Sequence, residues 1–103
     1  MNYSLVVRAW CSLNNINEAW NVVDKMVPLG LQPCSVTYNT IVSAYVRNGD
    51  IERGEAVSSE MQIYNVHPDQ STCDIIIIGY IEVGKTKDAL RFLYKMKDLW
   101  VLS

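Results

Sequence analysis

The sequence repeats itself every 35 residues, and this period limits the possible folds more than any other feature. Shifting the chain by 35 positions aligns residues of the same kind. The clearest columns are Met26, Met61 and Met96; Trp10, Tyr45 and Tyr80; Val6, Ile41 and Ile76; and Pro33 and Pro68. A unit of this length buries its apolar face against its neighbours, so about three units are needed for stability. The period predicts a single array over residues 1–103, with units at approximately 1–34, 35–69 and 70–103.

Each unit has the pattern of two helices joined by a short turn. In the middle unit, the apolar residues from Tyr38 to Tyr45 follow the i, i+3, i+4, i+7 spacing of one helix face. Gly49 suits a left-handed helix end, Asp50 suits the N-cap of a second helix, and Pro68 stops that unit. The expected fold class is therefore all-α. The expected helices lie near residues 2–13, 16–29, 37–48, 51–64, 72–83 and 86–98.

Other columns of the repeat predict how the helices pack and where they end. Ala19, Gly54 and Ala89 share a column on the second helices, which indicates close approach of the two helices of a hairpin. The methionine column has helical spacing and is interpreted as core. Asn65 stands where the first unit has Gly30, so both are expected to be left-handed helix ends. The second-helix faces expected to be buried are Ala19, Val22, Val23 and Met26; Ile51, Gly54, Val57, Met61 and Tyr64; and Ala89, Phe92, Leu93 and Met96.

The composition is that of a folded protein and excludes a disordered chain or a disulfide framework. The 103 residues are 50% hydrophobic and 19% charged, an ordinary globular balance. The net charge of −2 gives no overall positive field, so any contact with nucleic acid must rest on a local patch. Cys11, Cys34 and Cys73 have no C-x-x-C spacing, which predicts reduced thiols that are mostly packed. We expect no metal, no cofactor and no small-molecule substrate.

The longest apolar run, from Ile75 to Ile81, is far shorter than a membrane span. No signal peptide or Arg/Ser-rich transit segment opens the sequence. We therefore expect no membrane contact, and we expect a mature or excised piece or one separated from its targeting segment.

One motif could suggest an enzyme. Residues Gly79 to Thr86 match the phosphate-loop pattern G-x-x-x-x-G-K-[ST], which requires a preceding strand and an exposed Gly-rich loop. The 35-residue period instead places Gly79 inside a helix, in the column of Ala44, and places Gly84 in the turn between two helices. The only histidine, His67, lies in a turn. The sequence therefore predicts that the chain is not an enzyme.

The middle unit resembles the pentatricopeptide repeat. It opens with Val36–Val42 (VTYNTIV) and ends with Asn65–Asp69 (NVHPD), whereas the family typically opens with VTYNTLI and ends with Gly, a branched residue, a variable residue, Pro and Asp. Gly30–Pro33 is similar to that ending, and the third unit departs from the pattern where Cys73 replaces Tyr. The Trp-x-x-Leu-Gly start of tetratricopeptide units is absent. The resemblance implies a right-handed α-solenoid whose first helices line a concave groove for single-stranded RNA.

The resemblance also implies the role of particular residues, since in this family one repeat contacts one base. The base is chosen by the residue after the tyrosine of the first helix and by the last residue of the unit. In the middle unit these are Asn39 and Asp69, the pair that the family uses for uracil. Val36 would pack against the face of the base, and Arg47 would hold the phosphate.

The other two units carry this pattern less completely. In the first unit the base-reading positions hold Ser4 and Cys34, and Ser12 occupies the phosphate position. In the third unit Asp74 occupies the first base-reading position, Glu82 occupies the phosphate position, and the second reading position lies beyond the last residue.

Two functions fit these observations. The first is a single-stranded RNA-binding module of a mitochondrial or chloroplast factor for RNA processing, stability or translation. The second is a protein-interaction scaffold that uses the same groove. Arg8 and Arg47 favour RNA, whereas Asp74 and Glu82 favour a protein partner or a degenerate repeat. With one or two phosphate contacts, three isolated repeats would bind RNA weakly.

Overall fold

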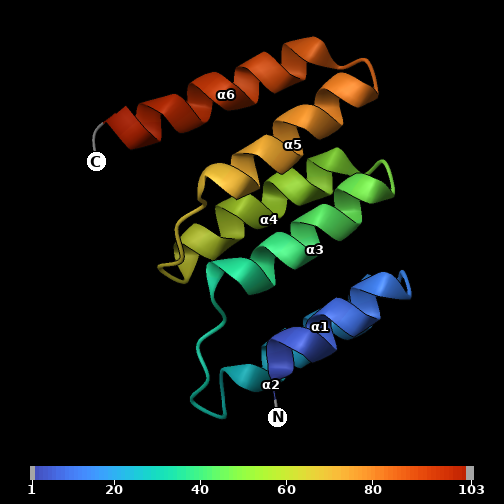
Figure 1. Cartoon of the computed structure of the whole chain (residues 1–103). Helices are drawn as coiled ribbons and strands as arrows, with labels where there is room; N and C mark the ends of the chain where they lie inside the picture. Colours follow the sequence, from blue (N-terminus) through green and yellow to red (C-terminus); the bar gives the residue numbers. More distant parts are fainter. Residues whose placement is uncertain (1, 102–103) are drawn as a thin grey trace.

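The computed structural model describes the backbone of residues 2–101 and the side chains of residues 2–98. Within residues 2–101 it contains six helices, which form three antiparallel hairpins stacked in chain order (Figure 1). The helices are α1 (Tyr3–Ser12), α2 (Ile16–Met26), α3 (Ser35–Arg47), α4 (Ile51–Ile63), α5 (Gln70–Glu82) and α6 (Thr86–Val101). Within residues 2–101 there is no strand, and Ile75–Ile78 lie in α5. The predicted all-α solenoid is confirmed.

Four helix boundaries differ from the prediction by two or three residues. Helices α3 and α5 begin two residues early, because Cys34 and Asp69 have extended backbones and act as N-cap residues directly after the prolines. Helix α2 ends at Met26 rather than near residue 29, since Pro28 has no N–H to donate to the preceding turn. Helix α6 continues three residues further than expected, to Val101.

The helices form two layers. In the first layer α1 packs against α3, and α3 packs against α5; α2, α4 and α6 form the second layer, each packed on the first helix of its own hairpin (Figure 1). The second layer reaches the next hairpin where α2 touches α3 and α4 touches α5. The Cα atoms span 40 × 32 × 15 Å, and the smallest of these dimensions is the thickness of two packed helices. No helix within residues 2–101 is both long and apolar enough to cross a membrane.

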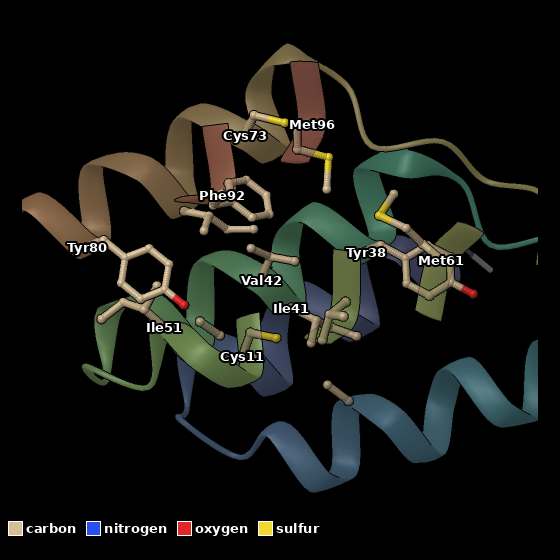
Figure 2. Close-up of a cluster of buried hydrophobic side chains, with 14 of the residues drawn as sticks. Cys11, Tyr38, Ile41, Val42, Ile51, Met61, Cys73, Tyr80, Phe92 and Met96 are labelled. Atoms are coloured by element: carbon tan, nitrogen blue, oxygen red, sulfur yellow. The ribbon is translucent and has the colours of Figure 1, made fainter. Parts of the chain in front are cut away.

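An apolar core runs through all three hairpins (Figure 2). Its largest fully buried members include Tyr80, Phe92, Ile41, Ile51, Met61, Ile76 and Met96. The methionine column is buried throughout, as predicted. Tyr64 and Leu93, which were expected on the buried faces, are instead 55% and 43% exposed. Tyr64 follows the last residue of α4, and Leu93 lines an open hollow between α5 and α6 together with Cys73 and Ile77.

The turns that end the helices also follow the repeat. Asn14, Gly49 and Gly84 have φ of 61°, 79° and 82°, and Gly30 and Asn65 have φ of 76° and 62°, so the predicted left-handed positions are confirmed.

Small residues allow neighbouring helices to approach. A Cβ atom on Gly54 would lie 3.3 Å from Val46 Cγ2, which supports the predicted close contact within a hairpin. A Cβ atom on Gly79 would lie 2.6 Å from Val46 Cγ1, so this glycine lets α5 pack against α3. Gly79 is therefore a helix-packing residue, as its column indicates, and not part of a phosphate-binding loop.

The N-cap residue of α4 is the predicted one, Asp50, but its side chain does not make the expected hydrogen bond. Its Oδ2 instead lies 3.3 Å from Nε of Arg53, one turn along the same helix. An ion pair at the helix start replaces the expected cap.

Candidate nucleic-acid interface

A groove of about 380 Å³ lies between α1 and α3. It is lined by Arg8, Cys11, Ser12, Val36, Asn39, Thr40, Ser43 and Arg47. The five lining residues of α3 follow the spacing i, i+3, i+4, i+7 and i+11, so they share one face of that helix. The structure thus brings together three of the predicted site residues, Val36, Asn39 and Arg47.

The groove combines a cationic end with an exposed apolar side chain. Arg8 and Arg47 are both exposed and come from different helices, and none of the lining residues is acidic. Val36 is 59% exposed, which leaves its branched side chain free to pack against a flat ligand. Cys11 lies at the floor, where burial raises the pKa of its thiol although the charge of Arg47 opposes this rise. The thiol is therefore neutral at physiological pH.

Asn39 and Asp69, the two predicted base-reading residues of the middle unit, are in contact. Asn39 Nδ2 donates to Asp69 Oδ1 over 3.3 Å. Asp69 Oδ1 also accepts the backbone N–H of Thr72 at 3.0 Å, while the Asp69 backbone N–H donates to Thr72 Oγ1 at 3.2 Å. This reciprocal pair is the capping box of α5. The N-terminus of α5, which opens the third repeat, therefore holds Asp69, the last residue of the middle repeat, beside Asn39.

The same contacts keep Asp69 ionised. The hydrogen bond from the Thr72 backbone N–H holds the pKa of the Asp69 carboxyl below its usual value, and the Asn39 amide and Thr72 hydroxyl reinforce the effect. At neutral pH Asp69 is thus a carboxylate that only accepts hydrogen bonds. One N–H of the Asn39 amide points to it, and the other N–H is available to a ligand.

Thr72 is a participant that sequence reasoning missed. Its hydroxyl is hydrogen-bonded to Asn39 Oδ1, although 33 residues separate the two in the sequence. The first hairpin has the same arrangement, because Ser4 Oγ lies 3.0 Å from Thr37 Oγ1 and Cys34 Sγ lies 3.7 Å from that same hydroxyl. The available signal was that Thr37 and Thr72 share a column, each three residues after an N-cap.

The remaining predicted residues differ in their surroundings. Cys34 is exposed, and the hydrogen bond from the Thr37 backbone N–H lowers the pKa of its thiol. Cys11 and Cys73 are buried, which agrees with the prediction of mostly packed thiols. Asp74 lies outside the α1–α3 groove, accepts a hydrogen bond from Gln70 Nε2 at 3.0 Å and faces α6.

Family models match almost the whole chain. A pentatricopeptide repeat domain matches residues 2–48, a PPR repeat family matches residues 33–81, and a PPR repeat matches residues 71–101. The chain belongs to the pentatricopeptide-repeat family.

Pentatricopeptide repeat-containing proteins of Arabidopsis thaliana are similar along the chain. One is 39% identical over 101 residues, which is 96% of this chain and 18% of that protein. A second, named chloroplastic, is 29% identical over 98 residues, or 94% of this chain and 13% of its own length. A third, named mitochondrial, is 29% identical over 82 residues, or 77% of this chain and 12% of its length. The chain thus spans less than a fifth of these pentatricopeptide-repeat relatives.

Solved pentatricopeptide-repeat structures share the fold. The crystal structure of maize PPR10 superposes with a TM-score of 0.81 at 27% identity, covering 97% of this chain and 14% of that one. PPR10 in complex with an 18-nt psaJ RNA element gives a TM-score of 0.82 at 26% identity, covering 94% and 14%. The PPR domain of Arabidopsis thaliana protein-only RNase P 1, in complex with tRNA, gives 0.73 at 18% identity over 94% and 50%. This last likeness concerns the fold alone.

Proposed function

We propose that this chain is a single-stranded RNA-binding segment of a longer pentatricopeptide-repeat protein that acts in mitochondrial or chloroplast RNA processing, stability or translation. The observation that carries the proposal is the groove between α1 and α3. It presents an exposed apolar residue, a base-reading amide and two arginines, with no acidic residue in its lining. The solved structure of the maize relative with RNA supports this assignment, and the relatives named chloroplastic or mitochondrial support an organellar site of action.

The middle repeat is the one equipped to choose a base. The free N–H of the Asn39 amide can donate to a carbonyl oxygen, and uracil carries carbonyl oxygens on its Watson–Crick edge. Asp69 holds the other N–H and thereby fixes the amide within the groove. Val36 packs against the face of the base, and Arg47 contacts the phosphate. We therefore assign uracil to this repeat.

The flanking repeats contribute less in this proposal. Ser4 and Cys34 offer one hydroxyl and one weakly hydrogen-bonding sulfur to a base. Asp74 presents a carboxylate on α5, where Glu82 stands at the phosphate position. RNA binding by the 103-residue chain is therefore weak and falls steeply with added salt.

The test is a competition assay with the intact chain. Short single-stranded RNAs that differ at one nucleotide would compete for binding at low salt, and uracil should displace the probe best at the position facing the middle repeat. Discrimination of about 1–3 kcal/mol, the size of a good bidentate base contact, is the upper end of the expected range. Equal competition by all four nucleotides would reject base reading and favour the protein-scaffold alternative, for which the acidic residues Asp74 and Glu82 are the supporting observation.

A further inference from the structure

Thr72 is buried at the point where the second and third hairpins meet. Thr72 is 0% exposed, so a ligand in the groove cannot touch it. Its hydroxyl nevertheless lies against Asn39 Oδ1 and 3.1 Å from Asp69 Oδ1. Buried threonine hydroxyls need a partner, but the capping box already supplies one through the Asp69 backbone N–H. The contact with Asn39 is additional to what helix capping requires.

Counting protons settles which way the Asn39 amide faces. The Thr72 hydroxyl accepts from the Asp69 backbone N–H and has a single proton to donate. The hydroxyl lies closer to Asn39 Oδ1 than to Asp69 Oδ1, which already accepts the Thr72 backbone N–H, so the hydroxyl proton goes to Asn39 Oδ1. The reversed amide would place its oxygen against the Asp69 carboxylate, where two acceptors repel each other. The amide is therefore held with its oxygen toward Thr72 and its nitrogen toward Asp69.

The geometry recurs in the first hairpin with different side chains. Thr37 is also 0% exposed, and its hydroxyl lies 3.0 Å from the hydroxyl of Ser4, the residue that corresponds to Asn39. Both threonines belong to the first helix of the repeat that follows the reading residue. Because the arrangement persists when Asn is replaced by Ser and Asp by Cys, it belongs to the junction between repeats.

We infer that Thr72 is a positioning residue that fixes the Asn39 amide, so that base selection by the middle repeat is completed by a buried hydroxyl of the next repeat. The inference rests on the proposed RNA-binding function and deepens it. With the amide oxygen held by Thr72, the middle repeat presents a donor to the base. A base with a carbonyl at the facing edge is accepted, and one with an amino group there is rejected.

The binding test compares three variants of the whole chain in the competition assay. Thr72→Val keeps the shape of the side chain but removes the hydroxyl, and should lower the preference for uracil over cytosine about two- to tenfold, the worth of one neutral hydrogen bond. Thr72→Ser retains the hydroxyl and should retain the preference. Thr37→Val removes the matching hydroxyl from the other junction and should leave the preference of the middle repeat unchanged. Full preference in Thr72→Val would overturn the inference.

A measurement on the unsubstituted chain keeps the inference testable if Thr72→Val does not fold. Side-chain amide protons of Asn39, observed by ¹⁵N-edited NMR, should show stronger nuclear Overhauser effects to the β protons of Asp69 than to the γ-methyl of Thr72. The reverse order would mean that Thr72 does not hold the amide oxygen, and the inference would fail. Absence of any base preference in the unsubstituted chain, with the expected amide orientation, would instead reject the proposed function.

Discussion

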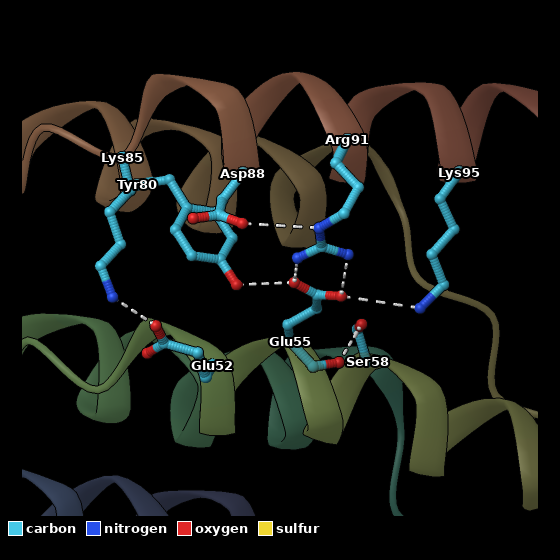
Figure 3. A network of polar contacts seen from close by, with 8 residues as sticks. All are labelled: Glu52, Glu55, Ser58, Tyr80, Lys85, Asp88, Arg91 and Lys95. Carbon is cyan, nitrogen blue, oxygen red and sulfur yellow. Dashed lines mark hydrogen bonds and ion pairs between the residues drawn. The ribbon is translucent and has the colours of Figure 1, made fainter.

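The two junctions between hairpins are built on the same backbone plan but differ in polar chemistry. At the first junction, Trp20 Nε1 on α2 donates to the hydroxyl of Tyr45 on α3 over 3.0 Å. At the second, the hydroxyl of Tyr80 on α5 donates to Glu55 Oε1 on α4 over 2.6 Å (Figure 3). Trp20 and Glu55 share a column, as do Tyr45 and Tyr80. The repeat therefore conserves the place of the contact, while the residue types decide whether it is neutral or ionic.

Helix α6 extends the ionic version of the contact. Arg91 donates to both carboxylate oxygens of Glu55, at 2.7 and 3.1 Å, and Lys95 Nζ lies 3.6 Å away (Figure 3). The side chain of Glu55 is only 12% exposed. Burial by itself would raise the pKa of this carboxyl, but the hydrogen bonds from Arg91 and Tyr80 hold it below its usual value. Glu55 is thus a nearly buried anion whose stability depends on its partners.

An exposed pair lies beside this cluster. Lys85 Nζ is 2.6 Å from Glu52 Oε1, with both side chains about half exposed. At the first junction an exposed contact in other columns joins two amides, where Asn48 Nδ2 donates to Asn14 Oδ1 over 2.5 Å. The comparison shows that stacking does not require charge. The apolar columns position the hairpins, and each junction then satisfies its polar groups with the residues available.

The largest expected effect tests whether the apolar columns hold the stack. Met61→Ala should destabilise the chain by about 2–5 kcal/mol, because it opens a cavity at a position that is 0% exposed. Glu60→Ala, one residue earlier on the exposed face of α4, should change the free energy of unfolding very little. Urea unfolding followed by circular dichroism measures both. Equal midpoints for the two variants would show that the stack does not depend on this column.

The next effect separates the ionic junction from the neutral one. Glu55→Gln should destabilise by about 1–3 kcal/mol at pH 7, because it removes charged hydrogen bonds and leaves Arg91 without its carboxylate. Trp20→Phe, which removes the hydrogen bond at the first junction, should cost about 0.5–1.5 kcal/mol.

The pH dependence gives an independent check on Glu55. Its pKa is lower in the folded chain than in the unfolded chain, so its contribution is present above the ordinary glutamate pKa of about 4.3 and is lost as the pH falls through the lower folded value. The stability difference between wild type and Glu55→Gln should therefore shrink in acid. A difference that stays constant from pH 7 to acid would show that the ionised carboxylate is not its source.

A smaller effect concerns base choice at the two junctions. Asp69→Asn replaces an acceptor by an amide that can also donate, and should shift the preference of the middle repeat from uracil toward cytosine by about 1 kcal/mol. The matched change at the first junction, Cys34→Ser, should leave that preference unchanged. Competition between RNAs that differ at the single facing nucleotide measures the shift. If both variants behave alike, the second junction is not the one that reads this base.

The smallest expected effect is on salt dependence. Arg47→Ala should reduce the slope of log K against log salt by about 0.7–1, the share of one phosphate contact, without changing base preference. Arg53→Ala removes the same charge from α4, outside the groove, and should leave the slope nearly intact. Equal slopes for the two variants would mean that the charge acts through the overall field of the protein and not through the groove.

The sequence by itself determined the repeat, the helices and the turns. Columns such as Met26, Met61 and Met96 identified the core, and the left-handed positions at Gly49 and Asn65 were predictable because they depend on local backbone preferences. The sequence did not predict that α3 and α5 begin two residues early, because an N-cap is defined by backbone angles and hydrogen bonds and not by residue type alone. The side chain of Asp50 makes no capping hydrogen bond because Arg53 competes for its carboxylate, and the sequence does not show which of the two contacts forms. The base-reading roles of Asn39 and Asp69 stay predictions that rest on family resemblance.

Only the tertiary structure decided which polar groups meet across the junctions. Thr72 reaches Asn39 over 33 residues of sequence, and Arg91 reaches Glu55 over 36. Neither pairing follows from a helical period, because that period describes one helix face and does not say how far the next hairpin is rotated against it. The direction of the Asn39 amide depends on a hydroxyl, a carboxylate and a backbone N–H from two hairpins. Such a choice is made when the hairpins stack, since only then do the hydroxyl and the carboxylate come within hydrogen-bonding distance of Asn39.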